Sequence, residues 1–356
     1  MSGAPLNSTP LNFSPLDYVP LLRRVLAGDD LSSAEMAELI GAIMDETLSP
    51  VRAAALLAGL AAKGETVDEV VGAARAMRER SVRVDHGLPL VLDIVGTGGD
   101  NSHTINISTA AAFVVAGCGV PVGKHGNRAA SSSCGSADVL EAVGVRIDCS
   151  PEESARALRE HNITFLFAQR HHPSFRAVGP IRRELGVRTV FNVLGPLTNP
   201  AGANRQLIGV ARPEHVALVA DALRVLGADA GAVVHGTDGL DEISGEAPTD
   251  VVQFGPDGVR RWTLDPARYG VRATRAEILG GDVATNAAAL LAILDGERSP
   301  RADLVLLNAA LALVVAGDAV DVDDGMVRAR TSVDTGRARA ALDALRRERR
   351  TLEVTS

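Results

Sequence analysis

The stretch Val91-Leu-Asp-Ile-Val-Gly-Thr-Gly-Gly-Asp100, continued by Asn101-Ser-His-Thr-Ile-Asn-Ile-Ser-Thr109, decides how the rest of the chain is interpreted. A short apolar run typical of a buried strand breaks into three glycines within four residues, and an Ala-rich run typical of a helix follows. Glycine lets the backbone bend and approach an anion closely, and the free N–H groups and positive dipole end of the next helix favour negative charge. The stretch therefore predicts a strand, a phosphate-binding turn and a helix.

Short apolar runs alternate with helical patterns after Val91. The candidate strands are residues 91–95, 120–123, 163–168, 206–211 and 231–235. The candidate helices are residues 108–117, 136–143, 151–160 and 213–226, followed by a helical segment over 274–317 and a charged helix over 325–350. Strands joined by helices predict right-handed crossovers and a mainly parallel, buried sheet, with ligands at the carboxyl ends of the strands. This part of the chain is therefore predicted to be α/β.

The part of the chain before Val91 carries helical signals and no strand pattern. Capping boxes begin helices at Ser32 and Thr66, and a helix that starts at Pro50 ends at Gly64. Three prolines among Ser and Asn predict a flexible arm ahead of these helices. We expect an arm over 1–15, a small all-helical domain over 16–85 that is joined by helices from about 173–188, and a large α/β domain over 86–356.

Composition limits the classes of protein that the chain can represent. Apolar residues make up 46% and charged residues 22% of the 356, as in an ordinary globular protein. A net charge of −8 argues against a protein that coats nucleic acid or an anionic membrane. Three widely spaced cysteines encode neither a disulfide framework nor a zinc knuckle. Because we find neither a signal peptide nor an apolar run of membrane-span length, we expect a cytoplasmic protein.

A second polar stretch, Lys124-His-Gly-Asn-Arg-Ala-Ala-Ser-Ser-Ser-Cys-Gly-Ser-Ala-Asp138, also follows a short strand and runs into a helix. It brings together a cation, amide and hydroxyl donors and a flexible turn, which favours a second phosphate contact over a plain polar loop. The first stretch is not a dinucleotide fingerprint, because position 101 is Asn instead of the third glycine. It is not a P-loop either, because no Gly-Lys-Ser/Thr follows.

The adjacent carboxylates Asp241 and Glu242 stand just beyond a predicted strand. Such a pair suits a hard divalent ion that keeps several waters and bridges to substrate phosphates, as Mg²⁺ does. An isolated Asp-Glu pair is more often a solvated acidic turn. The phosphate-binding turn elsewhere in the chain favours the metal.

A third group of residues indicates a site for a planar carboxylate. Arg182 lies in Arg182-Arg183-Glu-Leu-Gly186, early on a predicted helix, and an arginine there can bind a carboxylate bidentately, although most helix arginines are merely solvated. His171 and His172 do not predict zinc, because adjacent histidines point apart and no third ligand is suitably spaced.

Four stretches together resemble the anthranilate phosphoribosyltransferases of tryptophan biosynthesis. They are Gly96-Thr-Gly-Gly-Asp100 with Asn106-Ile-Ser-Thr109, Lys124-His-Gly-Asn-Arg128, Asp241-Glu242, and Asn192-Val-Leu-Gly-Pro-Leu-Thr-Asn-Pro200. The resemblance covers residues from about 20 to 345. It implies a small helical domain hinged to a large α/β domain, a homodimer packed through the helical domains, and two Mg²⁺ ions as cofactors. It also implies that the anthranilate amine attacks C1 of 5-phosphoribosyl 1-diphosphate and releases diphosphate.

The same resemblance implies roles for individual residues. The residues that would hold phosphoribosyl diphosphate are Gly96, Gly98, Gly99, Asp100, Thr104, Asn106, Ser108, Thr109, Lys124, Ser131, Gly135 and Ser136. The residues that would receive anthranilate are Gly96, Asn127, His172 and Arg182. Ser108, Asp241 and Glu242 would serve the metal, and Lys124, Asp241 and Glu242 would be catalytic. Gln169 stands where the family commonly has Pro, so the entry path for anthranilate departs from the family pattern.

Two other function classes are weighed against this resemblance. Pyrimidine nucleoside phosphorylases are expected to share the fold, but they carry Lys-His-Ser-Thr-Gly-Gly where this chain has Lys124-His-Gly-Asn127. DNA-binding proteins of the same fold need a basic groove, which the net charge and the Asp241-Glu242 pair disfavour. Whether a separate glutamine amidotransferase subunit associates stays open.

Overall fold

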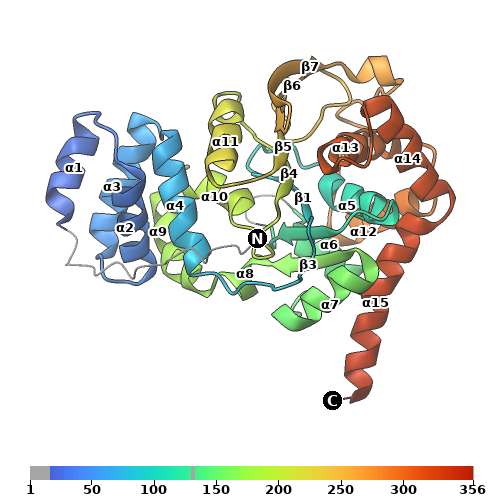
Figure 1. Cartoon of the computed structure of the whole chain (residues 1–356), viewed down its shortest axis with the longest axis horizontal. Coiled ribbons are helices and arrows are strands. Elements are labelled where there is room, and N and C mark those ends of the chain that lie inside the picture. The colour runs from blue at the N-terminus through green and yellow to red at the C-terminus, as the bar shows by residue number, and fades with distance from the viewer. Residues whose placement is uncertain (1–16, 130–132, 356) are drawn as a thin grey trace, which may run out of the picture.

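The computed structural model describes residues 17–129 and 133–355, with side chains up to 347. Two lobes make up this part of the chain, a helical lobe at one end and an α/β lobe that contains the sheet (Figure 1). The predicted arm over 1–15 lies outside the described residues. No helix within them is long and apolar enough to cross a membrane.

The helical lobe is built from helices whose ends follow from local sequence. Its first four helices are α1 Tyr18–Leu26, α2 Ser33–Met44, α3 Pro50–Lys63 and α4 Val67–Glu79. Ser32 and Thr66 form the two predicted capping boxes, because each accepts from the backbone N–H of a Glu three residues on. Pro50 opens α3 and Gly64 ends it, as predicted.

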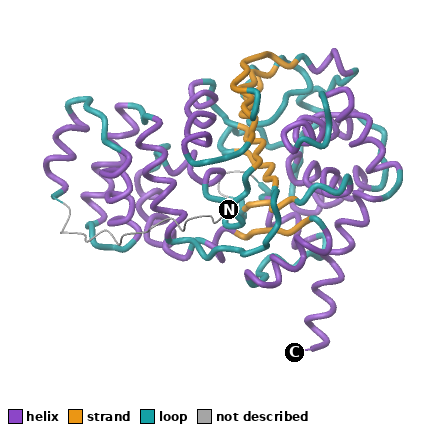
Figure 2. Tube along the Cα trace, in the orientation of Figure 1, coloured by secondary structure: helices purple, strands orange, loops and turns teal. Residues whose placement is uncertain are grey.

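The sheet has seven strands in the order β3-β2-β1-β4-β5-β6-β7. Figure 2 shows strands in orange with helices around them. The strands are β1 Leu92–Gly96, β2 Val122–Gly126, β3 Ile163–Phe167, β4 Arg205–Gly209, β5 Ala230–Gly236, β6 Thr249–Gly255 and β7 Gly258–Leu264. The first five are parallel, whereas β6 and β7 are antiparallel. The predicted fold class is therefore confirmed, and the β6–β7 hairpin adds an edge that the sequence did not predict.

Helices surround the sheet and connect its strands. They are α5 Ile107–Gly117, α6 Ser136–Ala142, α7 Pro151–His161, α8 Ala168–His171, the 3₁₀ turn η1 Pro173–Ala177, α9 Val178–Leu185, α10 Phe191–Leu197, α11 Glu214–Val225, the 3₁₀ turn η2 Pro266–Tyr269, α12 Val283–Leu294, α13 Pro300–Ala316, α14 Val322–Asp334 and α15 Arg337–Thr355. Ser150 caps α7 in a third capping box with Glu153.

Alternate residues of the central strands point into two different cores. Leu207 and Val234 pack with α5, α12 and α13, whereas their neighbours Ile208 and Val233 pack with α10 and α11. The second core also contains the buried residues of the helical lobe, together with Val178 and Ile181 of α9. Helix α9 also contacts α3, and the turn η1 contacts α2.

Three predicted elements need correction. The segment 274–317 is not one helix, because its first nine residues contain Gly280 and Gly281 and helix α12 starts only after its cap Asp282. The charged helix predicted over 325–350 is two helices, since Gly336 with φ +73° separates α14 from α15.

The third correction concerns strand β2, predicted over 120–123. It runs on to Gly126, which pairs with Phe167 of β3. Lys124 and His125 therefore lie inside a strand and not in the loop beyond it.

Candidate active site

The glycine-rich turn lies at the carboxyl edge of the sheet, between β1 and α5. Gly98 and Gly99 have φ of +67° and +75°, a left-handed conformation that side chains rarely adopt. Asn101 and His103 also have positive φ, at 55° and 54°. These residues bend the chain between β1 and α5, at the edge where ligands gather in parallel sheets.

The two carboxylates that follow β5 occupy N–H groups of this turn and of α5. Asp241 Oδ2 accepts from Gly98 N at 2.6 Å, and Glu242 Oε1 accepts from Ser108 N at 3.2 Å. Asp100 Oδ2 in turn accepts from Asp241 N at 3.4 Å. The structure therefore brings the predicted phosphate-binding turn and the predicted metal ligands into direct contact.

Gly96 has no side chain because Asp241 occupies the space beside it. A Cβ atom on Gly96 would lie 2.4 Å from Asp241 Oδ2, closer than carbon and oxygen can approach. The end of β1 therefore packs, through this glycine, against the turn that carries Asp241 and Glu242, which we call the acidic turn.

Burial changes the acidity of the groups that meet here. It raises the pKa of Asp241 well above its usual value, and the nearby Asp100 and Glu242 raise it further. Burial also raises the pKa of Glu242 to about 7, against the opposing effect of Lys124. The pKa of Lys124 is lowered, mainly by burial. A divalent cation would stabilise the ionised carboxylates, so the site favours such an ion.

The donor set suits magnesium and not zinc. Within residues 17–129 and 133–355 no group of three or more His, Cys, Asp or Glu side chains could hold a metal ion. Mg²⁺ does not need such a cage, because it keeps several waters and commonly binds one or two carboxylates plus substrate phosphates. Asp241 and Glu242, with the Ser108 hydroxyl beside them, could supply those oxygen ligands.

Lys124 lies beneath the turn and not in an open cleft. Its side chain comes from β2, only 4% of the residue is exposed, and Nζ donates to Ile94 O at 2.7 Å and to Ser108 Oγ at 3.3 Å. The cation thus reaches the first turn of α5 from below.

The second predicted loop is held largely by its own side chains. Gly135 N donates to Asp138 Oδ2 at 2.9 Å, and Ser136 Oγ donates to Asn127 O at 3.2 Å. Asn106 connects this loop to α12, since its Nδ2 donates to Cys134 O and its Oδ1 accepts from Asn286. Ser131 lies outside the described residues.

Two further predicted phosphate ligands lie at the start of α5. Thr109 is buried, with 1% of the residue exposed. Thr104 forms an isolated antiparallel bridge with Leu279, which fixes the backbone before the helix.

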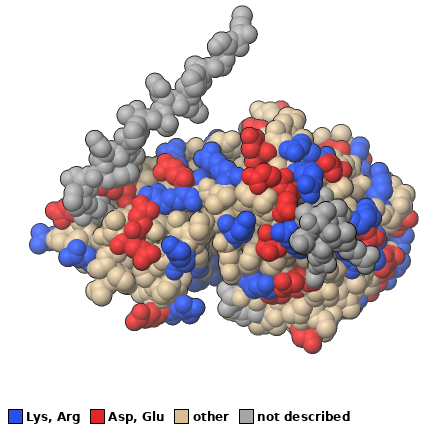
Figure 3. Space-filling model, turned by 90° about the horizontal axis from the view of Figure 1, so that it is seen from below, with Lys and Arg blue, Asp and Glu red and all other residues tan. Residues whose placement is uncertain are grey.

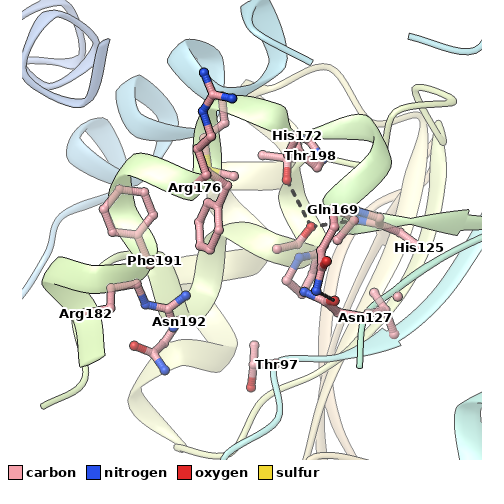
Figure 4. Close-up of a pocket in the computed structure, with 18 of the residues that line it drawn as sticks. Thr97, His125, Asn127, Gln169, His172, Arg176, Arg182, Phe191, Asn192 and Thr198 are labelled. Atoms are coloured by element: carbon pink, nitrogen blue, oxygen red, sulfur yellow. Dashed lines mark hydrogen bonds between the residues drawn. The ribbon is translucent and has the colours of Figure 1, made fainter. Parts of the chain in front are cut away.

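A pocket of about 790 Å³ lies on the other side of Gly96, toward the helical lobe. All four residues predicted to receive anthranilate line it, namely Gly96, Asn127, His172 and Arg182. Figure 4 shows Arg182 beside Asn192 at one side of this pocket and Asn127 beside Gln169 at the other. The structure therefore brings together side chains from three separate stretches of the sequence.

Arg182 supplies a cation to the pocket wall. Its guanidinium stacks 5.4 Å from the centre of the Phe175 ring, and Phe175 meets Phe191 edge-on at 5.7 Å. Among the described residues Arg182 has no carboxylate within ion-pair distance. It stands in the last turn of α9 and not early on a helix as predicted, because α9 begins at Val178 and ends at Leu185.

Two histidines at the pocket are held neutral. The rings of His125 and His172 lie 5.1 Å apart, and burial lowers the pKa of His125 to about 3 and that of His172 to about 4. Gln169, which departs from the family pattern, donates to Asn127 Oδ1 at 3.4 Å and lines the pocket. Neither histidine can act as a proton donor near neutral pH.

Sequence reasoning missed several residues of this site. His125, Phe175, Phe191 and Asn192 line the pocket, and each lies inside or next to a stretch that had been singled out for another residue. Arg188 donates from Nη1 to Gly99 O at 3.2 Å, a contact across 89 residues that no local pattern could indicate.

Comparisons with known proteins agree with this geometry. Residues 19–81 match the family described as "Glycosyl transferase family, helical bundle domain", and residues 88–339 match "Glycosyl transferase family, a/b domain". An anthranilate phosphoribosyltransferase from Thermomicrobium roseum is 50% identical over 332 residues, which is 92% of this chain and 94% of the relative. One from Symbiobacterium thermophilum is 50% identical over 327 residues, 92% of this chain and 96% of the relative.

The chain belongs to the anthranilate phosphoribosyltransferase family.

Solved structures of this family share the fold. The crystal structure of anthranilate phosphoribosyltransferase from Thermus thermophilus is 43% identical with a TM-score of 0.88, and covers 94% of this chain and 100% of that one. The enzyme from Saccharomyces cerevisiae in complex with PRPP and Mg is 28% identical with a TM-score of 0.86, and covers 94% and 98%. Another structure of the yeast enzyme contains 4-fluoroanthranilate.

Membership in the anthranilate phosphoribosyltransferase family confirms the predicted resemblance and excludes the two rival classes as the best description. The surface agrees, since on the face shown in Figure 3 basic and acidic side chains are interspersed and no continuous basic stripe is visible. The fold and the reaction class are those of this family, while the use of Mg²⁺ and the role of each residue are proposed below.

Proposed function

We propose that this chain transfers the phosphoribosyl group of 5-phosphoribosyl 1-diphosphate to the amine of anthranilate, in tryptophan biosynthesis. The observation that carries the proposal is the position of Gly96, which lines the pocket on one side and abuts Asp241 on the other. A ligand on the glycine turn and a ligand in the pocket would therefore meet at this residue.

The diphosphate is proposed to bind the N–H groups of the turn and of α5, chiefly those of Gly98 and Ser108. Both N–H groups already donate to carboxyl oxygens in this structure, which supports their fitness for an oxyanion. Lys124 beneath Ser108 adds positive charge. The remaining proposed contacts are Gly96, Gly99, Asp100, Thr104, Asn106, Thr109, Ser131, Gly135 and Ser136.

Magnesium is proposed to bind between the acidic turn and the diphosphate. Asp241 and Glu242 would supply carboxylate oxygens, Ser108 its hydroxyl, and the substrate its phosphate oxygens. When bound, Mg²⁺ neutralises charge that develops on the departing diphosphate. We propose two ions, as for the family resemblance.

Anthranilate is proposed to bind in the pocket with its carboxylate on Arg182. A planar guanidinium without a carboxylate partner matches a planar carboxylate, and Phe175 holds that guanidinium in place. Asn127 and His172 would lie against the ring and amine. This orientation directs the amine toward Gly96 and the ribose.

The reaction needs little acid–base catalysis. The amine nitrogen attacks C1 of the ribose, the bond from C1 to the diphosphate oxygen breaks with inversion, and the nitrogen then loses a proton to solvent. An aromatic amine is already deprotonated near neutral pH, which agrees with the neutral state of His172. Positioning by the turn and the pocket can supply most of the acceleration, up to roughly 7–11 kcal/mol in favourable cases.

Two further features belong to the proposal. We propose a homodimer through the helical lobe, in accord with the family resemblance. We propose a cytoplasmic location, because none of Cys118, Cys134 and Cys149 forms a disulfide in the structure, as a reducing compartment allows.

A fluorescence assay tests the proposed function. Purified protein with Mg²⁺, anthranilate and phosphoribosyl diphosphate should consume the fluorescence of anthranilate, and omission of Mg²⁺ should abolish the change. Thymidine with inorganic phosphate is the matched control for a nucleoside phosphorylase. Turnover of thymidine without turnover of anthranilate would refute the proposal.

A further inference from the structure

Helix α13 contains one polar side chain in an otherwise apolar stretch. Between Leu304 and Ala316 every residue except Asn308 is apolar, and Asn308 is 0% exposed. Burying an amide costs free energy unless its donor and acceptor atoms are paired, so a leucine there would pack at no such cost. Packing in the apolar core therefore does not explain why position 308 is an asparagine.

The partner of Asn308 is the backbone directly after the acidic pair. Its Oδ1 accepts from Ile243 N at 3.2 Å, and its Nδ2 donates to Leu304 O at 3.0 Å and reaches Ile243 O at 3.5 Å. Because the Ile243 N–H can only donate, the amide oxygen must face it, which fixes the orientation of the side chain. A helix 65 residues farther along the chain thus binds the residue next to Glu242.

The other side of the acidic turn presses against strand β4. A Cβ atom on Gly209 would lie 1.7 Å from Asp241 O, so only glycine admits the turn at this distance. The carbonyl of Gly209 also accepts from Thr97 N at 2.9 Å, which joins the same strand end to the glycine-rich turn. Helix α13 packs on β4 and β5. The acidic turn is therefore fixed between Gly209 and Asn308.

We propose that Asn308 is a positioning residue for the metal site, which acts through Ile243 on the direction of the Asp241 and Glu242 carboxylates. The inference rests on the proposed function in taking these two carboxylates as metal ligands. Residues that orient metal ligands in this way typically change metal affinity by about 10- to 100-fold when they are replaced. Asn308 is fully buried and does not line the pocket, so its replacement should act on the metal and spare the anthranilate pocket.

The test compares Asn308→Leu with a control in the same helix, Leu311→Ala. Leucine fills at least the space of the asparagine side chain but leaves the Ile243 N–H unpaired. Leu311→Ala opens a cavity at another fully buried position and leaves Asn308 intact. Binding of Mn²⁺ in the presence of inorganic pyrophosphate is followed by electron paramagnetic resonance, since Mn²⁺ accepts the oxygen ligands that Mg²⁺ uses. The melting temperature of each variant is recorded alongside.

We expect Asn308→Leu to weaken Mn²⁺ binding about tenfold and Leu311→Ala to leave it unchanged although the protein melts earlier. Asn308→Ala, which adds no bulk and suits a helix, gives the same readout should the leucine variant not fold. Wild-type affinity in the Asn308 variants, or an equal loss in Leu311→Ala, would overturn the proposal. Anthranilate turnover by the wild-type protein tests the proposed function separately. If the wild-type protein binds no Mn²⁺ in the presence of pyrophosphate, both the proposed metal site and the role of Asn308 are overturned.

Discussion

Replacing Asp241 by alanine should strengthen the binding of diphosphate when no metal is present and weaken it when Mg²⁺ is present. The side chain has two opposite effects on that ligand. Its Oδ2 occupies the Gly98 N–H at 2.6 Å, which is one of the groups proposed to bind the diphosphate. With Mg²⁺ present the same carboxylate would, under the proposed function, bind the ion that holds the diphosphate in place.

The size of the metal-free effect follows from the hydrogen bond that the substitution releases. Burial beside Asp100 and Glu242 raises the pKa of Asp241, which favours the neutral carboxyl when no metal is bound, and a hydrogen bond from Gly98 to a neutral carboxyl is of ordinary strength. Such a bond contributes about 0.5–1.5 kcal/mol, which corresponds to about two- to tenfold in affinity. With Mg²⁺ the loss of a metal ligand outweighs this gain.

Isothermal titration with inorganic pyrophosphate, once with a chelator and once with Mg²⁺, measures both effects. Asp257→Ala is the matched control, because it removes one exposed carboxylate from the β6–β7 turn, beside the start of β5 and away from its carboxyl end. Weaker binding under both conditions would show that Asp241 does not compete for the Gly98 N–H, and the reasoning from this contact would be wrong.

Three further substitutions test other parts of the site. Arg182→Ala should raise the KM for anthranilate about 10- to 100-fold, which corresponds to the free energy of a hydrogen bond between charged groups, and leave the KM for phosphoribosyl diphosphate nearly unchanged. Equal effects on the two KM values would rule out the carboxylate-binding role. Gly96→Ala should raise both KM values, because the new methyl group must displace the Asp241 carboxyl, and steady-state kinetics that change for one substrate alone would contradict this. His172 has a folded pKa of about 4 against an unfolded value near 6.5, so its stabilising contribution is present above pH 6.5 and is lost as the pH falls toward 4, by up to about 3 kcal/mol. Melting curves of His172→Gln and wild type should therefore draw closer, or cross, between pH 8 and pH 5, and a constant difference would contradict the buried neutral state.

Local patterns predicted the elements whose ends and faces are encoded nearby. The capping boxes at Ser32 and Thr66 and the five parallel strands appeared as expected, because a cap needs only four residues and a buried strand is a short apolar run. The β6–β7 hairpin was not predicted, because β7 lies at the edge of the sheet, where Arg260 and Arg261 are exposed and no apolar alternation is needed. Helix α10 escaped because Gly195-Pro196 is ordinarily read as a break.

For the candidate site too, local sequence features could be predicted and contacts between distant residues could not. The glycine turn and the Asp241-Glu242 pair could be found from sequence, since backbone bending and paired carboxylates are local properties. Arg188, Gly209 and Asn308 could not, because each acts through a contact with a residue 32 to 89 positions away in the sequence. On sequence alone Asn308 is one polar residue in an apolar helix, and Gly209 is one of 35 glycines.

The core shared by the helical lobe and one face of the sheet affects how the protein unfolds, and so how much folded protein a cell retains. Leu56 and Met77 of the small lobe belong to the same apolar cluster as Ile208 and Val233 of the sheet, and Arg78 of α4 donates to Leu197 O at 2.8 Å across the boundary. Neither lobe can lose its packing without exposing the other, so we expect one cooperative melting transition. A destabilising change in α4 would then lower the amount of intact enzyme without altering the chemistry of each surviving molecule.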